Sequence, residues 1–189
     1  MKRLAVVLCV ALCALGLASV ASADIMVTAP TLSVPNTSAT GSFTVTVEFT
    51  GSYNVAGYDI DLLLTGRNSA TGLAFAGASG ATTNYVFSLP HAGFSMQDNT
   101  ASHIFGQDFL SCGTETIANV TKNLVTVNYT IAKGTEGVFD VALSNIDGFN
   151  DGSNSLGEGF TPGVITITPE PATMALLAVG ALAMIRRRR

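Results

Sequence analysis

The sequence predicts an all-β protein, an antiparallel, jelly-roll-like β-sandwich of about 7–9 strands. Three observations support this fold class. The 189-residue chain has 19 Gly and no Trp, and between its apolar ends it is rich in Thr, Val, Ser and Asn, which favour strands and turns over helices. Several stretches alternate apolar and polar residues with period two. Clusters of Gly, Asn and Ser separate these stretches, as turns do.

Five stretches show the alternation of a strand with one buried face: residues 42–49, 57–64, 123–131, 137–143 and 163–168. Successive side chains of a strand point to opposite faces, so the apolar positions are expected to point into the core. These positions are Phe43, Val45, Val47 and Phe49; Tyr58, Ile60, Leu62 and Leu64; Val125, Val127, Tyr129 and Ile131; Phe139, Val141 and Leu143; and Ile165 and Ile167.

Four less regular stretches are also expected to be strands because of their apolar and β-branched content. They are residues 25–34, 73–76, 84–89 and 102–109. All nine stretches lie within residues 24–168, a length that suits one domain with a sizeable core.

The N-terminus has the three parts of a secretory signal peptide. Lys2 and Arg3 precede an apolar stretch over residues 4–17, and Ala21 and Ala23 form the small-residue cleavage site. We therefore expect residues 1–23 to form a signal helix that export machinery recognises and removes.

Removal of the signal peptide leaves one of the 3 cysteines of the chain, Cys112. A single thiol cannot form an internal disulfide, so an exported domain of this kind depends on its packed core. Cys112 is expected to be a small buried apolar residue, as free cysteines commonly are.

The charge of the chain is divided unevenly between its segments. Six of the nine Lys and Arg residues lie in the two terminal segments, and residues 24–168 hold twelve acidic against three basic residues, a net charge of −9. Such a domain is repelled by nucleic acid and by anionic lipid, which excludes nucleic-acid binding as its function.

The C-terminus combines a Pro-Glu-Pro motif, an apolar stretch and a basic cluster. Pro169, Glu170 and Pro171 precede the apolar residues 172–185, and the chain ends in Arg186, Arg187, Arg188 and Arg189. Fourteen helical residues span about 21 Å at 1.5 Å each, and arginines that reach for the membrane surface lengthen that span. The arginines are expected to stay cytoplasmic.

This arrangement resembles the PEP-CTERM sorting signal over residues 169–189. The resemblance implies a transmembrane helix over the apolar stretch and processing near the Pro-Glu-Pro motif by an exosortase, a membrane-embedded, transpeptidase-like cysteine enzyme. Proteins with this signal are exported by Gram-negative-type bacteria, often ones that build exopolysaccharide. A plain C-terminal anchor is the alternative, although anchoring alone does not require the Pro-Glu-Pro motif.

Two stretches of the domain resemble the cohesin-like group of jelly-roll sandwiches. They are "TGSFTVTVEFTGSYNVAGYDIDLLL" over residues 40–64 and "NLVTVNYTIAKGTEGVFDVAL" over residues 123–143. Cohesins usually carry an Asp-Pro-x-x-Leu turn where Leu64 here runs into "TGRNSATGLAF". The resemblance implies a module that binds a partner protein or a carbohydrate, and fold alone does not choose between these ligands.

The stretch "DGFNDGSNSLGE", residues 147–158, is a candidate calcium loop. Calcium takes several oxygen ligands from a flexible loop, and this one offers Asp147, Asn150, Asp151, Asn154 and Glu158. Phe149 stands at the third ligand position of the twelve-residue spacing. The alternative is an acidic, Asn- and Gly-rich loop between the last strands.

The remaining candidate groups are weaker. Asp59 and Asp61 share one strand face about 7 Å apart, a spacing compatible with acid–base chemistry and equally with a solvent-exposed strand. His91 and His103 lack metal-ligand spacing and are expected at the surface. No catalytic motif is present, so the chain is expected not to be an enzyme.

Carbohydrate contact would depend on tyrosines, because the chain has no Trp. Tyr58 and Tyr129 fall on the apolar strand faces, which leaves Tyr53 and Tyr85 as candidate ligand-binding rings. Taken together, the patterns predict an exported cell-surface or extracellular-matrix protein with a structural or adhesive role linked to exopolysaccharide. The alternative is a cohesin-like or carbohydrate-binding module.

Overall fold

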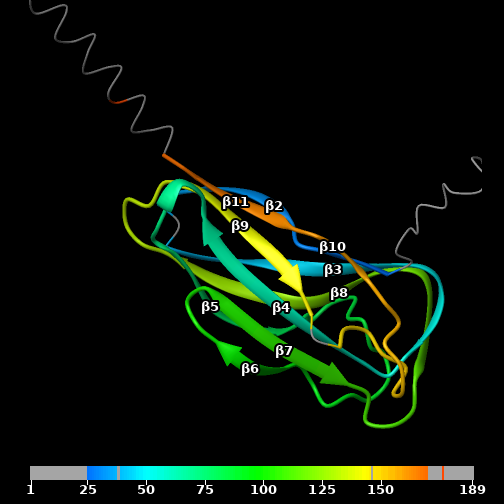
Figure 1. Cartoon of the computed structure of the whole chain (residues 1–189). Helices are drawn as coiled ribbons and strands as arrows, with labels where there is room; N and C mark the ends of the chain where they lie inside the picture. The colour runs from blue at the N-terminus through cyan, green and yellow to red at the C-terminus, as the bar shows by residue number, and fades with distance from the viewer. Residues whose placement is uncertain (1–24, 38, 146, 170–175, 177–189) are drawn as a thin grey trace, which may run out of the picture.

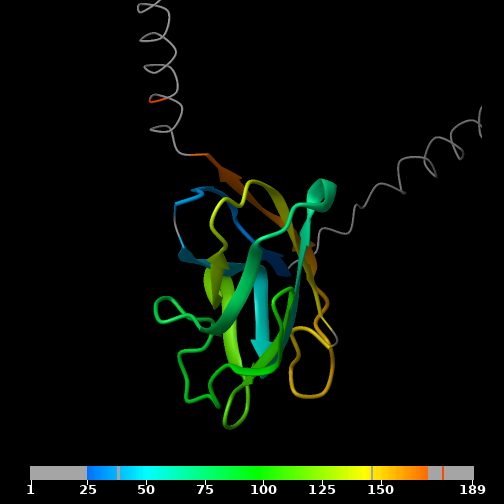
Figure 2. The ribbon, with the colours of Figure 1, turned by 90° about the vertical axis from the view of Figure 1, so that its left-hand side faces the viewer.

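A computed structural model describes residues 25–37, 39–145, 147–169 and 176, and shows two β-sheets packed against each other (Figures 1 and 2). The five-stranded sheet has the order β10-β1-β3-β8-β5, and the six-stranded sheet the order β2-β11-β9-β4-β7-β6. The strands are β1 (Ile25–Thr28), β2 (Thr31–Pro35), β3 (Thr40–Val55), β4 (Gly57–Gly66), β5 (Leu73–Gly80), β6 (Ser95–Asn99), β7 (His103–Phe109), β8 (Glu115–Ile131), β9 (Gly137–Ser144), β10 (Gly159–Thr161) and β11 (Gly163–Thr168).

The all-β sandwich is confirmed, but the expected strand number and the purely antiparallel pairing are wrong. The described residues form eleven strands, and both sheets are mixed because β1 pairs with β10 and β2 pairs with β11 in parallel. The first and last segments of the domain run in the same direction, so they can pair only in parallel.

The expected strand over residues 25–34 is two strands, one in each sheet. The break lies at Ala29 and Pro30, where proline has no N–H to donate to a ladder. The last segment changes sheets beside it, between β10 and β11. A side chain at Gly163 would collide with the carbonyl group of Pro30 and with Ala29, so glycine allows the two crossing segments to touch.

Residues 84–89 are not a strand, which corrects another expectation. They belong to the loop between β5 and β6, where Tyr85 makes one isolated bridge to Asn123. Val86 and Phe87 of this loop are buried in the core, so their apolar character reflects burial and not pairing. The sequence patterns also missed β6, β10 and the first half of β8.

The inward faces of the alternating strands are confirmed. Every apolar position predicted to point inward is buried, apart from Leu143, which is half-buried against the core. The largest fully buried side chains include Tyr58, Phe49, Phe139 and Phe149. Phe149 comes from the loop between β9 and β10, and its ring lies 5.4 Å from that of Phe49 and 5.6 Å from that of Tyr58.

Strands β4 and β11 finish at one end of the sandwich, and the loop after β9 lies at the other. Ile167 of β11 pairs with Gly137, and Gly66 pairs with Phe139, so β11 finishes at the end where β4 also finishes. Gly57 at the start of β4 bridges Asn150 at the opposite end, where the loop after β9 lies (Figure 1). The described part of the chain contains no helix long and apolar enough to cross a membrane. The expected signal and transmembrane helices lie outside the described residues.

Removal of the Phe149 ring should lower stability strongly. Phe149→Ala is expected to reduce the free energy of unfolding by about 3–5 kcal/mol, because it deletes a buried ring between two others. Phe109→Ala is the matched control, since Phe109 is 39% exposed, and it should cost less than about 1 kcal/mol. Urea unfolding measures both, and a loss of less than about 1 kcal/mol for Phe149→Ala would show that the loop ring does not support the core.

Candidate functional site

The outer face of the six-stranded sheet has an apolar centre beside acidic side chains. The alternation of β4 directs Asp59, Asp61 and Leu63 away from the core, and Leu63 is 48% exposed. Leu63 pairs with His103 of β7 on one side and with exposed Ala142 of β9 on the other. Single exposed apolar side chains are common on protein surfaces, so Leu63 is a candidate contact only together with Ala142 and the acidic side chains around it.

His103 lies between two carboxylates on this face. Its Nδ1 is 2.7 Å from Oδ2 of Asp98 and its Nε2 is 2.6 Å from Oδ1 of Asp61. The hydrogen bond to Asp98 raises the pKa of His103 most, partial burial opposes the rise, and Asp61 adds to it. When it is protonated, the imidazole can donate to both carboxylates, and it then joins β6, β7 and β4 across the face.

The predicted acid pair on β4 is engaged by separate partners. Asp61 binds His103, whereas Oδ2 of Asp59 accepts a hydrogen bond of 2.9 Å from the backbone N–H of Asp147. The two carboxylates share the outer face as predicted. Each one holds a neighbouring segment in place, as expected for a structural role.

The centre of the other outer face, on the five-stranded sheet, has a different chemistry. Thr44 pairs with Thr126 and Ser42 pairs with Asn128 across β3 and β8. These side chains are short, neutral and polar. Thr40, Ser42, Asn128 and Thr130 also line an open hollow of about 400 Å³. The two faces therefore offer different surfaces to a ligand.

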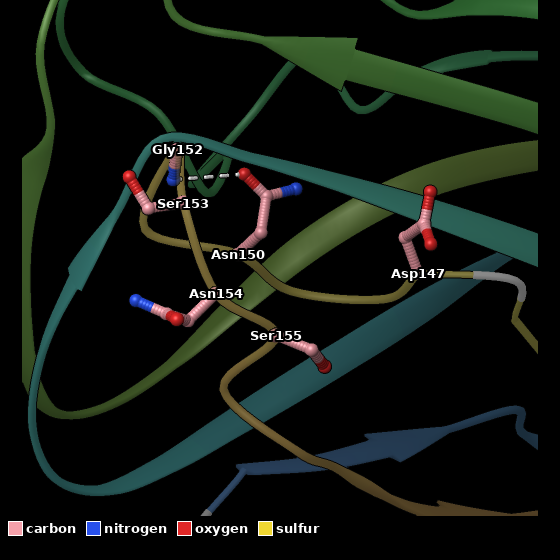
Figure 3. Close-up of a pocket in the computed structure, with 6 residues that line it drawn as sticks. All are labelled: Asp147, Asn150, Gly152, Ser153, Asn154 and Ser155. Atoms are coloured by element: carbon pink, nitrogen blue, oxygen red, sulfur yellow. Dashed lines mark hydrogen bonds between the residues drawn. The ribbon is translucent and has the colours of Figure 1, made fainter.

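The loop between β9 and β10 encloses an open pocket of about 230 Å³ (Figure 3). Its lining residues are Asp147, Asn150, Gly152, Ser153, Asn154 and Ser155. Oδ1 of Asp151 accepts hydrogen bonds from the N–H groups of Asn154, at 2.7 Å, and Ser153, at 2.8 Å. These hydrogen bonds lower the pKa of Asp151, and the bond from Asn154 lowers it most. They also form the Asp-centred turn that the composition of the loop favours.

The five predicted calcium ligands divide into two groups. Asp147, Asn150 and Asn154 line the pocket, whereas Asp151 binds its own turn. Glu158 accepts a 3.4 Å hydrogen bond from the N–H of Phe149. Burial raises the pKa of Glu158, that hydrogen bond opposes the rise, and the charge of Asp59 adds to it.

Phe149, at the third ligand position, is core. Among the described residues, no three His, Cys, Asp or Glu side chains gather closely enough to hold a metal ion. Calcium binding therefore stays a prediction, and any site would depend on amide and backbone oxygens as well as carboxylates.

A buried polar network connects β7 with the loop between β5 and β6. Asp108 is 1% exposed, and its Oδ2 lies 2.5 Å from the hydroxyl group of Tyr85 and 2.6 Å from Nδ1 of His91. The Tyr85 hydroxyl in turn lies 2.8 Å from that of Tyr58. Burial raises the pKa of both tyrosines, which keeps them neutral. Tyr85 donates its hydroxyl proton to Asp108, whereas the Tyr58 hydroxyl group also lies within hydrogen-bonding distance of the Leu124 carbonyl oxygen.

Glu115 binds the loop between β5 and β6 from a second side. Its carboxylate accepts hydrogen bonds from the backbone N–H groups of Ser88 and Leu89 and from the Ser88 hydroxyl group. Burial opposes ionisation, but these bonds lower the pKa of Glu115. The network was missed from the sequence, although Asp108 occupies an inward position of the predicted strand over residues 102–109, which is itself an indication of a buried, paired carboxylate.

The two candidate sugar-binding tyrosines have different surroundings. Tyr85 is partly buried, and its ring packs against Phe87 and His91, so its hydroxyl and ring both have structural partners. Tyr53 is half-exposed, with its hydroxyl 3.4 Å from the carbonyl oxygen of Thr50 and its ring tilted against Phe49. Sugar contact at either ring stays a prediction.

Cys112 is exposed, so the expectation that it is buried is wrong. It follows the end of β7 by three residues, in the turn before β8, where apolar neighbours do not enclose it. Of the sorting signal, the structure describes Pro169 and Leu176, which are both exposed. The cleavage residues Ala21 and Ala23, together with Glu170, Pro171, Arg186, Arg187, Arg188 and Arg189, lie outside the described residues.

Residues 168–189 match the PEP-CTERM protein-sorting motif. The chain thus carries a motif that marks an exported, membrane-anchored protein that is sorted through its C-terminus. Among curated proteins, none matches the sequence.

The domain is similar in structure to cohesins. The seventh ScaB type I cohesin of Pseudobacteroides cellulosolvens has a TM-score of 0.60 and 16% identity, over 77% of this chain and 93% of that one. A non-cellulosomal cohesin of the archaeon Archaeoglobus fulgidus has a TM-score of 0.54 and 13% identity, over 81% and 97%. The third cohesin ScaC of Acetivibrio cellulolyticus, in complex with the ScaB dockerin, has a TM-score of 0.55 and 9% identity, over 76% and 98%.

At these identities the similarity establishes a cohesin-like fold. It agrees with the predicted resemblance, although the chain lacks the usual Asp-Pro-x-x-Leu turn. The expectation that the chain is not an enzyme stays a prediction.

Stability should fall as pH rises through the pKa of His103. Asp98 and Asp61 raise this pKa above its ordinary value of 6.5. The stabilisation is therefore complete below about pH 6.5 and is lost as pH rises through the higher, folded-state pKa. Melting curves between pH 6 and pH 9 should show a decline that His103→Gln reduces. An unchanged profile in the variant would assign the decline to other groups.

Calcium should raise the melting temperature if the loop pocket binds it. Asp147→Asn is expected to remove the difference between calcium and chelator, because it deletes the carboxylate that lines the pocket. Glu136→Gln, an exposed change at the opposite end of the sandwich, is the control and should keep the difference. Identical melting of the unaltered protein in both conditions would rule out a stabilising calcium site.

Proposed function

We propose that this exported protein displays its sandwich at the cell surface or in the extracellular matrix, where it binds a partner protein through the outer face of the six-stranded sheet. The role is structural or adhesive. The observation that carries the proposal is the exposed Leu63 at the centre of β4, between His103 and Ala142.

Sorting through the C-terminal motif supports the location. In this proposal an exosortase breaks a peptide bond near Pro169–Pro171. The acyl carbon passes to water or to an acceptor amine, and the proton of that nucleophile goes to the amine of the released tail. Before this step, the apolar residues and Arg186–Arg189 would hold the chain in the membrane.

The charges around Leu63 favour a basic partner. Asp59, Asp61 and Asp98 lie on this face or at its edge. His103 is held between Asp61 and Asp98, and Arg67 is bound to Asp140 at 2.6 Å, so the carboxylates outnumber these two basic groups. With a net charge of −9 over residues 24–168, the domain would attract a partner that places Lys or Arg beside an apolar contact.

Leu63 is exposed on the outer face of the described domain, three residues before β4 ends at Gly66. Strand β11 ends at the same end of the sandwich. Among the similar structures, the third ScaC cohesin is in complex with a dockerin, so a cohesin fold can present a protein-binding surface. That relative supports a protein as the ligand here.

A neutral polysaccharide is the second candidate, on the other outer face. Thr40, Ser42, Asn128 and Thr130 offer hydroxyl and amide groups without charge around the open hollow. Exopolysaccharide could contact this surface by hydrogen bonds. The aromatic residue that also lines the hollow, Tyr129, is 4% exposed and offers little ring surface for stacking. The two candidates therefore predict contacts on opposite faces.

Photo-cross-linking on intact cells of the native host distinguishes the faces. A photoreactive residue in place of Leu63 should give a discrete protein adduct, whereas the same residue in place of Thr44, on the five-stranded sheet, should not. Both positions point outward from inner strands, with Leu63 exposed and Thr44 half-buried. An adduct from Thr44 alone, or equal smears from both positions, would contradict a partner on the proposed face.

A further inference from the structure

Strand β11 is an inner strand up to Ile167, and its last residue, Thr168, still pairs with β2. It pairs with β2 on one side and with β9 on the other. Thr168 pairs with Pro35, and its carbonyl oxygen accepts a 2.9 Å hydrogen bond from the N–H of Asn36. The sorting motif matches from Thr168 onward. No linker therefore separates the sheet from the motif.

The end of β11 is also held by its side chains. Ile165 is fully buried and Ile167 is 2% exposed, whereas Thr168 and Pro169 are exposed. Release of the last residues of β11 from the sheet would expose the Ile167 side chain to water. This exposure costs free energy in proportion to the apolar area of the side chain. The folded domain thus resists opening at this end.

Enzymes that act on a peptide bond bind the neighbouring residues as an extended segment, often by adding it to a strand of their own. The residues on the N-terminal side of Pro169–Pro171 are those of β11, and their hydrogen bonds already belong to β2 and β9. When the susceptible segment must open before it is cut, the rate follows the population of the open form.

We propose that the parallel ladder between β2 and β11 controls processing of the sorting signal: the last residues of β11 must leave β2 before the bond near Pro169–Pro171 is accessible. The inference rests on the proposed processing by an exosortase. It makes the N-terminal segment of the domain, through β2, a brake on the release of the C-terminal tail.

A linker variant tests this inference without altering the sandwich. Six Gly and Ser residues inserted between Thr168 and Pro169 in the full-length chain should increase the rate of conversion to the processed form several-fold in the native host. Pulse labelling with intact mass measurement reports the processed fraction over time.

Two proline variants in β2 provide a matched pair. Alternate N–H groups of a strand point the same way, so the N–H of Val34, like that of Asn36, faces β11, whereas the N–H of Ser33 faces away. Val34→Pro removes a ladder donor and should accelerate processing. Ser33→Pro keeps the ladder donors and should leave the rate close to that of the unaltered protein.

The outcomes distinguish control by the β2–β11 ladder from the proposed exosortase processing on which it rests. Processing at the same rate with and without the linker would overturn the brake and leave the sorting proposal intact. Retention of Arg186–Arg189 in the unaltered protein and in the linker variant would overturn processing itself, and the brake with it. Faster processing of the linker and Val34→Pro variants, with Ser33→Pro unchanged, is the expected result.

Discussion

Pairing between the first and last segments of the domain completes both sheets. β1 adds to the five-stranded sheet and β2 to the six-stranded sheet, and each pairs in parallel with a strand from the last ten residues of the domain. The two segments change sheets side by side, the first at Pro30 and the last at Gly163. A side chain at position 163 would collide with the Pro30 carbonyl group, so this position needs glycine. Because these contacts join residues more than a hundred positions apart, neither sheet is complete until nearly the whole domain has been exported.

Local alternation predicted the inner faces of the strands but not their partners. The pattern of β3, β4, β8 and β9 was sufficient because a strand with one buried face repeats every two residues. β6 has no such pattern, since all its side chains are exposed. Residues 84–89 have the opposite property: Val86 and Phe87 are apolar because a loop fills the core, and sequence alone does not distinguish that loop from a strand.

The candidate site was predicted in part for the same reason. Alternation placed Asp59 and Asp61 on one outer face, but the partners of His103 come from β4 and β6, and their positions depend on sheet order. The buried position of Asp108 could have been inferred from its strand register, whereas its bonds to Tyr85 and His91 could not. The burial of Cys112 was predicted wrongly, because the general preference of cysteine for buried positions does not hold in an exposed turn.

The direction of β11 has a mechanical consequence. A protein tethered by its tail and bound by a partner through β4 would be loaded along the axis of β11, between the tether and the sheet. Force along a strand flanked by two neighbours strains all the hydrogen bonds of both ladders together, in shear, whereas a sideways pull breaks them one by one. A domain held and bound in this way would resist tension along β11 through both ladders at once.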